Sequence, residues 1–162
     1  MVPTGVLEAL FLASTVGAIR AALATTEGGA TGTEGRGRVV VVGDDRLARA
    51  LLGEGVAVTA VVATEAKARR LPGAVVGPAD AVPLPDRAAG AVIGVGATST
   101  DGPALVAGWA RLVRDGGVLV LVDRGAPAVA SRRALAAGVT DLEQRSAGRM
   151  VITSGVVSAL LP

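Results

Sequence analysis

Few residue types in this sequence could carry chemistry, because its 162 residues include no histidine and no cysteine. Their absence excludes imidazole acid–base catalysis, disulfides and thiolate zinc sites. Asp44 and Asp45 are adjacent carboxylates that could ligate a cation, but such a pair more often caps a helix, and Asp45 is placed to do so. Ser99 and Ser131 could act as nucleophiles, yet no histidine can activate them and Lys67 is the only lysine. We therefore predict no catalytic residue and no metal site.

The elements around these residues follow the pattern of an α/β domain. From Arg38 onward, short β-branched runs alternate with stretches rich in alanine, leucine and arginine. The pattern predicts a Rossmann-like, mostly parallel sheet in an α-β-α sandwich, closed by a C-terminal antiparallel hairpin. The expected strands are Arg38–Val42, 56–62, 74–77, 90–95 and 118–122, the expected helices are 45–52, 64–71, 103–114 and Pro127–Ala136, and the expected hairpin strands are 139–145 and 149–156.

Composition divides the chain into three parts. Residues 1–24 form an apolar helix, residues 25–37 a flexible linker rich in glycine and threonine, and residues 38–162 the α/β domain. Apolar residues make up 51% and charged residues 19% of the chain, which is enough to bury a core. With Phe11 and Trp109 as the only aromatic residues, a stacking platform for nucleic acid is not expected.

Two segments resemble class I S-adenosylmethionine-dependent methyltransferases. Residues 81–93, AVPLPDRAAGAVI, resemble the family pattern ALPLPDGSFDAVI, and residues 110–123, ARLVRDGGVLVLVD, resemble ARVLRPGGRLVLVD. Residues 138–145 and 148–153 resemble the final hairpin of the family. The resemblance extends from about residue 38 to about residue 157 and implies a Rossmann-like fold, but fold alone does not fix function.

The sequence departs from the family pattern at the cofactor site. The resemblance implies acidic residues at the ends of the first two strands and an aspartate after the third, whereas this chain has Val41, Val62 and Pro78 there. Each lost charge-assisted hydrogen bond forfeits roughly 1.5–3 kcal/mol, so three losses come to roughly 5–9 kcal/mol. Micromolar binding supplies only about 8 kcal/mol in total. We therefore predict a degenerate site that holds no cofactor.

Two functions remain open. The first is a non-catalytic methyltransferase-like accessory or scaffold subunit of a larger assembly. The alternative is a small active methyltransferase with an atypical donor pocket that uses Asp44, Asp80 and backbone groups. Glu65 lies three residues beyond the end of the second strand. The segment at the end of the fourth strand, which contains Gly94 and Gly96, offers only small residues. The lone glycine pair is a weak signal.

The N-terminal helix carries apolar residues on almost all sides, which is typical of a helix buried in protein or lipid. Three alternatives fit: it folds back on the sheet, it inserts into or docks on a membrane complex, or it binds a soluble protein. The domain itself is expected in the cytoplasm, either free, peripheral to a membrane or anchored there by this helix. The residues predicted to contact a protein partner are Leu7, Leu10, Phe11, Leu12, Val16, Ile19 and Leu23.

A set of arginines near the C-terminus could form a basic patch that docks an acidic partner or anionic lipid headgroups. Acidic residues are interleaved with them, so a solvated face is the simpler interpretation. Nucleic-acid binding is not predicted. The basic residues are Arg124, Arg132, Arg133, Arg145 and Arg149, and the acidic ones are Asp123, Asp141 and Glu143.

Overall fold

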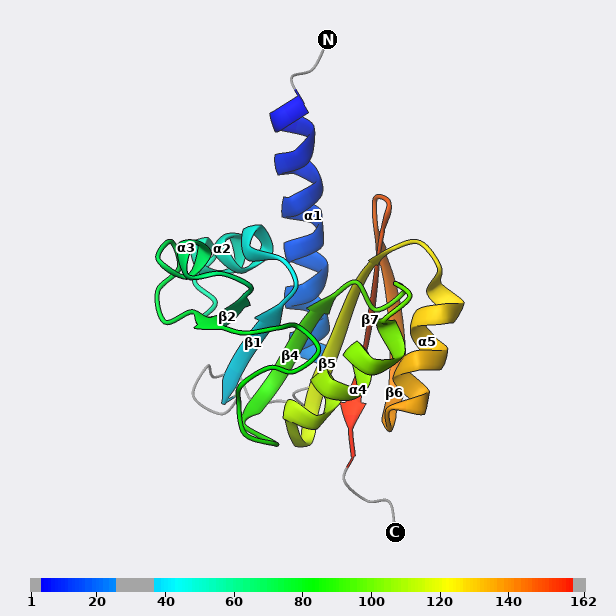
Figure 1. Ribbon diagram of the computed structural model, residues 1–162. Coiled ribbons are helices and arrows are strands. Elements are labelled where there is room, and N and C mark those ends of the chain that lie inside the picture. Colours follow the sequence, from blue (N-terminus) through cyan, green and yellow to red (C-terminus); the bar gives the residue numbers. More distant parts are fainter. Residues whose placement is uncertain (1–3, 26–36, 159–162) are drawn as a thin grey trace.

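A single seven-stranded sheet organises the molecule (Figure 1). The computed structural model describes residues 4–25 and 37–158, with the side chains of the first helix described from Leu12 to Ala24. The strands are β1 (Arg38–Val42), β2 (Val58–Val62), β3 (Val75–Val76), β4 (Ala89–Val95), β5 (Val113–Arg124), β6 (Val139–Ala147) and β7 (Met150–Val157). The helices are α1 (Thr4–Thr25), α2 (Asp45–Gly53), α3 (Glu65–Ala68), α4 (Gly102–Leu112) and α5 (Pro127–Ala136).

The strand order is β3-β2-β1-β4-β5-β7-β6. The first five of these strands are parallel, and the hairpin of β6 and β7 adds to β5 in the antiparallel sense. This topology confirms the predicted α/β class, the mostly parallel sheet and the C-terminal hairpin. Because the strand order reverses between β1 and β4, the carboxyl ends of the parallel strands form a crevice at that point.

Each face of the sheet is covered by helices, so the central strands are buried on both sides. In β1, Val39 and Val41 face one core cluster while Val40 and Val42 face the other. The first cluster packs under α1 and α2, and the second under α4 and α5. The run of four valines in β1 is therefore explained by burial on two faces.

Helix α1 folds back on the sheet along its C-terminal half. Val16, Ile19 and Leu23 are buried in the cluster shared with α2, and Leu12 packs at its margin. The N-terminal turns of α1 project past the sheet edge (Figure 1). None of the helices in the described part of the chain combines the length and apolarity that crossing a membrane requires. The predicted linker lies almost entirely outside the described residues.

Two elements differ from the expectation. The helix predicted over 64–71 ends at Ala68, because Arg70 and Leu71 donate to carbonyls only three residues back and tighten the chain into a turn. The residues between the expected helix 103–114 and the expected strand 118–122 lie inside β5, where the pairing with β4 shifts register by a bulge after Val113. A second bulge interrupts the outermost strand, β6, where Asp141 has a left-handed backbone (φ 53°).

Candidate functional site

A small cavity lies at the crevice where β1, β2 and β3 end. Its volume is about 110 Å³, whereas sites for small organic ligands span roughly 300–1,000 Å³. It is lined by the ends of the three strands and by the helix starts that follow them: Gly43, Asp44, Asp45, Val61, Val62, Ala63, Lys67, Gly77 and Ala79. The place that the family resemblance assigns to a cofactor is thus present in outline, with a volume below the usual range for organic ligands.

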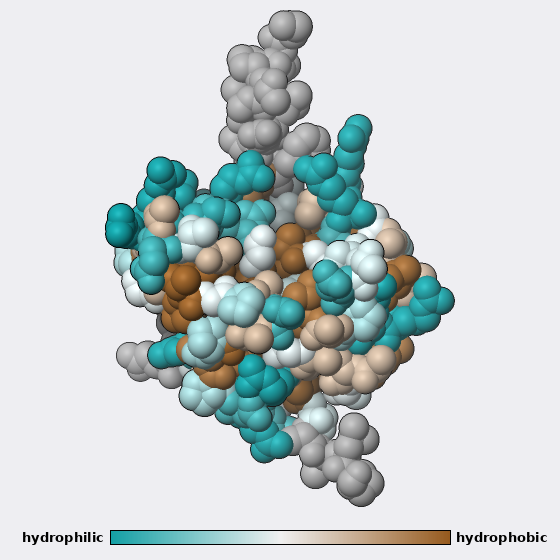
Figure 2. Space-filling model, viewed as in Figure 1, coloured by the Kyte–Doolittle hydropathy of each residue, from teal (hydrophilic) through white to brown (hydrophobic). Residues whose placement is uncertain are grey.

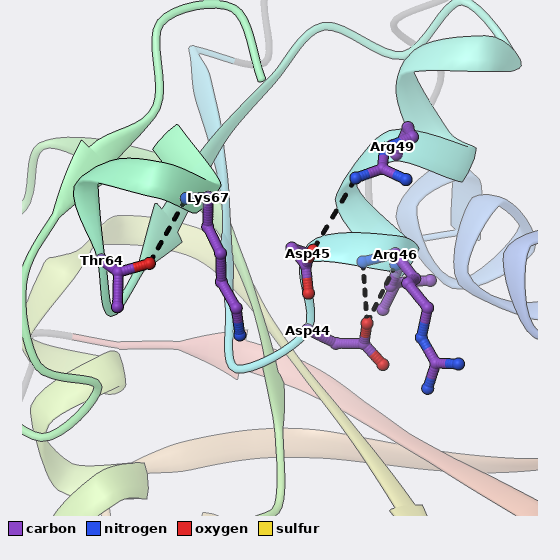
Figure 3. Close-up of polar contacts among 7 residues, drawn as sticks. Asp44, Asp45, Arg46, Arg49, Thr64 and Lys67 are labelled. Atoms are coloured by element: carbon purple, nitrogen blue, oxygen red, sulfur yellow. Dashed lines mark hydrogen bonds and ion pairs between the residues drawn. The ribbon is translucent and has the colours of Figure 1, made fainter. Parts of the chain in front are cut away.

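The carboxylate of Asp44 is committed to the start of α2. Its Oδ1 accepts hydrogen bonds from the backbone N–H of Arg46 at 2.9 Å and of Leu47 at 3.2 Å (Figure 3). Asp44 is therefore the N-cap, which corrects the assignment of that role to Asp45. Asp45 instead forms an ion pair with Arg49 at 3.8 Å, one turn along the helix. Both carboxylates therefore have partners within α2.

Lys67 is the basic side chain of the cavity lining. It extends from α3 toward the loop that joins β1 to α2 (Figure 3). Thr64 is the N-cap of the helix that carries it, and its hydroxyl accepts from the Lys67 backbone N–H at 3.3 Å. Glu65 and Asp80 are exposed and do not line the cavity. Of the two acidic residues that the alternative function would use, Asp44 therefore lines the cavity and Asp80 lies outside it.

Two of the three positions that the resemblance makes acidic are part of the hydrophobic core. Val41 is 1% exposed and Val62 is 5% exposed, and both belong to the cluster under α1 and α2. Pro78 is exposed, and its neighbours Gly77 and Ala79 line the cavity in its place. The aliphatic side chains supply no hydrogen-bond acceptor at the strand ends, so the residues present do not fit the polar edges of an adenosyl group.

The loop after β3 is held down from two directions. The indole Nε1 of Trp109 donates to the carbonyl of Ala79 at 3.0 Å. Pro83 closes over Gly77, where an added Cβ would lie 2.5 Å from the proline Cδ. Trp109 itself is fully buried against Gly94, at which a Cβ would come within 2.2 Å of the ring. Gly94, which the sequence analysis treated as part of a weak glycine motif, is therefore required for packing against Trp109.

The structure also contains a buried acid that sequence reasoning had placed on a solvated face. Asp123, the next-to-last residue of β5, is only 3% exposed. Its Oδ1 accepts from the backbone N–H of Thr98 at 3.0 Å and from the Thr98 hydroxyl at 3.1 Å. Its Oδ2 is buried and has no hydrogen-bond partner among the described residues. The continuous apolar run before Asp123 was the available signal, because it predicts a buried strand that carries the acid inward.

The loop after β4 is clamped by this acid and by Arg133. The guanidinium of Arg133 reaches from α5 and donates to the carbonyls of Ala97 at 2.5 Å and of Ser99 at 2.6 Å. Asp123 holds Thr98 between them. The loop after β4 is therefore fixed by internal partners, and its exposed side chains are small.

Burial raises the pKa of Asp123, against the lowering effects of the Thr98 hydrogen bonds, the Arg133 charge and the Ala97 backbone. The folded pKa lies above the unfolded value of 3.8, so the contribution of this group to stability is full below pH 3.8 and is lost as the pH rises through the folded pKa. Because asparagine does not titrate, we expect the free energy of unfolding of Asp123→Asn, relative to that of the wild type, to rise over that pH range. Urea unfolding at several pH values measures it.

The exposed Asp80 provides the control for this experiment, because Asp80→Asn removes a carboxylate that makes no buried contact. Its stability is expected to follow the wild type at each pH. If the curves of Asp123→Asn and the wild type run parallel across the whole range, the buried carboxylate does not titrate with folding.

The remaining candidates stay apart. Ser99 is exposed on the clamped loop, and the hydroxyl of Ser131 accepts from Gln144 at 2.9 Å. No cluster of three potential metal ligands occurs within the described ranges 4–25 and 37–158. Arg124, Arg132 and Arg149 are exposed as expected.

The helix residues assigned to a partner divide into two groups. Val16, Ile19 and Leu23 are buried in this chain's own core, so they are not available to another molecule, and Leu12 is half-buried beside them. The reason is that the sheet face under α1 would otherwise remain uncovered. Leu7, Leu10 and Phe11 lie outside the described side chains.

Known structures share this arrangement. DesVI from Streptomyces venezuelae superposes with a TM-score of 0.65 at 14% identity, over 91% of this chain and 92% of that one. The glycopeptide N-methyltransferase MtfA, in complex with S-adenosyl-L-methionine, gives 0.62 at 16% identity over 83% and 90%. The chain has the class I methyltransferase fold. The sequence resemblance is thereby confirmed at the level of the fold.

A further structure with the methyltransferase fold comes from a protein complex. A chain of the complex that contains the Haloferax volcanii Trm112 methyltransferase activator superposes with a TM-score of 0.64 at 15% identity, over 76% of this chain and 83% of that one. No known protein family matches the sequence of this chain. No curated protein matches it either.

Proposed function

We propose that this chain is a non-catalytic, methyltransferase-like accessory or scaffold subunit of a larger assembly, attached through α1. The observation that supports it is the cavity of about 110 Å³ at the donor site. Around that cavity, Val41 and Val62 pack inward, and the carboxylate of Asp44 caps α2. A chain built in this way keeps the rigid sheet while giving up the groups that hold the donor.

The acceptor side supports the same proposal. In a methyltransferase the loop after β4 must leave room for the substrate that receives the methyl group. Here Arg133 and Asp123 clamp that loop on both sides. A fixed loop with small side chains is better suited to presenting a surface than to binding and releasing a substrate.

Calorimetric titration with S-adenosylmethionine tests the proposal. We expect no measurable heat of binding at micromolar concentrations, because the missing polar contacts amount to most of the free energy of a micromolar complex. Titration with S-adenosylhomocysteine is expected to give the same result. A dissociation constant in the low micromolar range for either ligand would overturn the proposal.

The alternative, a small active methyltransferase with an atypical donor pocket, has one observation in its favour. Gly43 keeps a positive φ of 96°, and a Cβ there would lie 2.8 Å from the Val95 carbonyl, so the first bend of a cofactor loop is retained. This alternative requires the cavity to widen when the donor enters. A rise in melting temperature at saturating S-adenosylhomocysteine would support it, and an unchanged melting temperature would remove it.

A further inference from the structure

A second cavity lies at the other end of the sheet from the donor crevice, beside the strand starts of β4 and β5. Its volume is about 420 Å³, which falls within the range of roughly 300–1,000 Å³ typical of sites for small organic ligands. It opens where the carboxyl ends of α4 and α5 approach each other, at the lower edge of the molecule in Figure 1. This cavity is therefore large enough to hold a ligand that the donor crevice cannot.

The wall of this cavity is apolar. Figure 2 shows apolar surface over the lower end of α5 and hydrophilic side chains beside the lower end of α4. The aliphatic side chains that line the cavity are Ala107, Ala110, Val113, Ala136, Ala137 and Val157. They can cover hydrocarbon but offer no side-chain hydrogen bond, so the wall suits a ligand with an aliphatic part.

The charged side chains of the lining differ in whether they have partners. Arg111, in the last turn of α4, pairs with the carboxylate of Asp86 and donates to the Val82 carbonyl at 3.3 Å. Asp115 also takes part in an interaction within the chain. The guanidinium of Arg87 is exposed and has no hydrogen-bond or ion-pair partner among the residues that the structure describes. Arg87 therefore supplies the unpaired charge of the cavity.

The backbone of Arg87 is left-handed, with a φ of 59°. Its N–H donates to the Arg111 carbonyl at 3.0 Å, which fixes the residue against the end of α4. Residue 87 stands where the methyltransferase pattern ALPLPDGSFDAVI has glycine, the residue that adopts this backbone without strain. The chain thus carries an arginine at a position where its backbone is strained, and strain of this kind is typical of ligand-contacting residues.

We propose that this cavity binds a small aliphatic carboxylate, with the hydrocarbon against the aliphatic wall and the carboxylate on the guanidinium of Arg87. Two parallel N–H groups of a guanidinium match the two oxygens of a carboxylate. The competing ligand is an amine, because the carboxyl ends of α4 and α5 carry partial negative charge. The Asp86 carboxylate that an amine would use is already paired with Arg111, so charge complementarity favours the anion.

Titration of the full chain with sodium octanoate, followed by calorimetry and by amide chemical shifts, tests the proposal. We expect saturable binding that weakens at high salt, with the largest shifts at Ala107, Ala136 and Gly138. Acetate lacks the hydrocarbon and octylamine reverses the charge, so each is expected to bind about tenfold or more weakly than octanoate. Absence of octanoate binding, shifts confined to other residues, or tighter binding of octylamine would overturn the proposal.

Arg87→Gly separates the role of the side chain from that of the backbone. We expect the affinity for octanoate to fall about tenfold or more, because the charge-assisted hydrogen bonds are lost. The free energy of unfolding is not expected to fall, because glycine adopts a positive φ without strain. The matched control is Arg124→Gly, at the other end of β5 and outside the cavity lining, which is expected to bind octanoate as the wild type does. Equal losses of affinity in the two variants would overturn the proposal.

Ala107→Leu tests the aliphatic wall without changing any charge. Ala107 is an exposed helix position, so leucine there should not disturb folding. We expect the affinity for octanoate to fall about fivefold or more, because the larger side chain occupies the space of the ligand. Ala104→Leu, one turn earlier on α4 and outside the lining, is the control and is expected to have no effect. Unchanged affinity in Ala107→Leu would overturn the proposal.

The outcome is separable from the proposed function, because the two titrations use different ligands and different ends of the sheet. A chain that binds neither octanoate nor S-adenosylmethionine removes only the carboxylate site. A chain that binds both keeps the carboxylate site and removes only the non-catalytic role.

Discussion

Trp109→Ala is expected to lower the free energy of unfolding by about 3–5 kcal/mol. The indole is fully buried in the second core cluster with its ring against Gly94, and alanine would leave a cavity there. The change also removes the hydrogen bond to the Ala79 carbonyl. Because small domains are stable by only about 5–15 kcal/mol, this single change is a large part of the total. Urea unfolding followed by far-ultraviolet circular dichroism measures it.

Trp109→Phe is the matched control, since it keeps an aromatic ring against Gly94 but loses the indole donor. We expect a smaller loss than for alanine, made up of the unpaired Ala79 carbonyl and the reduced ring volume. Equal stability of Trp109→Ala and the wild type would mean that the ring does not fill the space between β4 and α4.

Val41→Asp is expected to cost about 3–5 kcal/mol of stability near neutral pH and still fail to create a donor site. The change restores the acidic residue type that the methyltransferase pattern has at the end of the first strand. In this chain, however, position 41 is 1% exposed and faces the core under α1 and α2, where an unpaired carboxylate has no partner. The measurement is urea unfolding together with calorimetric titration of S-adenosylmethionine.

The loss of stability in Val41→Asp is expected to depend on pH, because it comes from burying a charged carboxylate. Desolvation would raise the pKa of the new carboxyl, so the variant should recover stability as the pH falls and the group becomes neutral. Val41→Ala removes the same methyl groups without adding a charge, and its cost should not vary with pH in this way. Micromolar binding of S-adenosylmethionine by Val41→Asp would show that the missing acid alone had closed the site.

Local sequence signals were sufficient for most of the fold. The valine runs of β1 and β5 predicted buried strands, and the glycines and prolines between runs set most boundaries to within a few residues, with the start of β5 and the end of α3 as exceptions. The sequence also predicted that the first helix, with Val16, Ile19 and Leu23, is buried in protein or lipid. It could not decide whether these residues cover this sheet or contact another molecule, because both bury the same apolar surface.

The parts that sequence reasoning missed depend on contacts between distant segments. Asp123 is charged and has an arginine next to it, which favoured a solvated face, and its burial depends on the position of β5 between β4 and β7. Gly94 is required by Trp109, which lies fifteen residues later on a different element. Asp44 rather than Asp45 caps α2, because the choice between adjacent residues depends on where the helix begins.

The two outer strands make it difficult for sheets to join edge to edge. At one margin β3 has only two residues, which leaves almost no backbone for a neighbour to pair with. At the other margin the bulge at Asp141 bends β6, and its exposed charged side chains include Glu143. Fibrillar assembly by strand addition is therefore disfavoured at both ends, so a concentrated solution should resist aggregation of that kind.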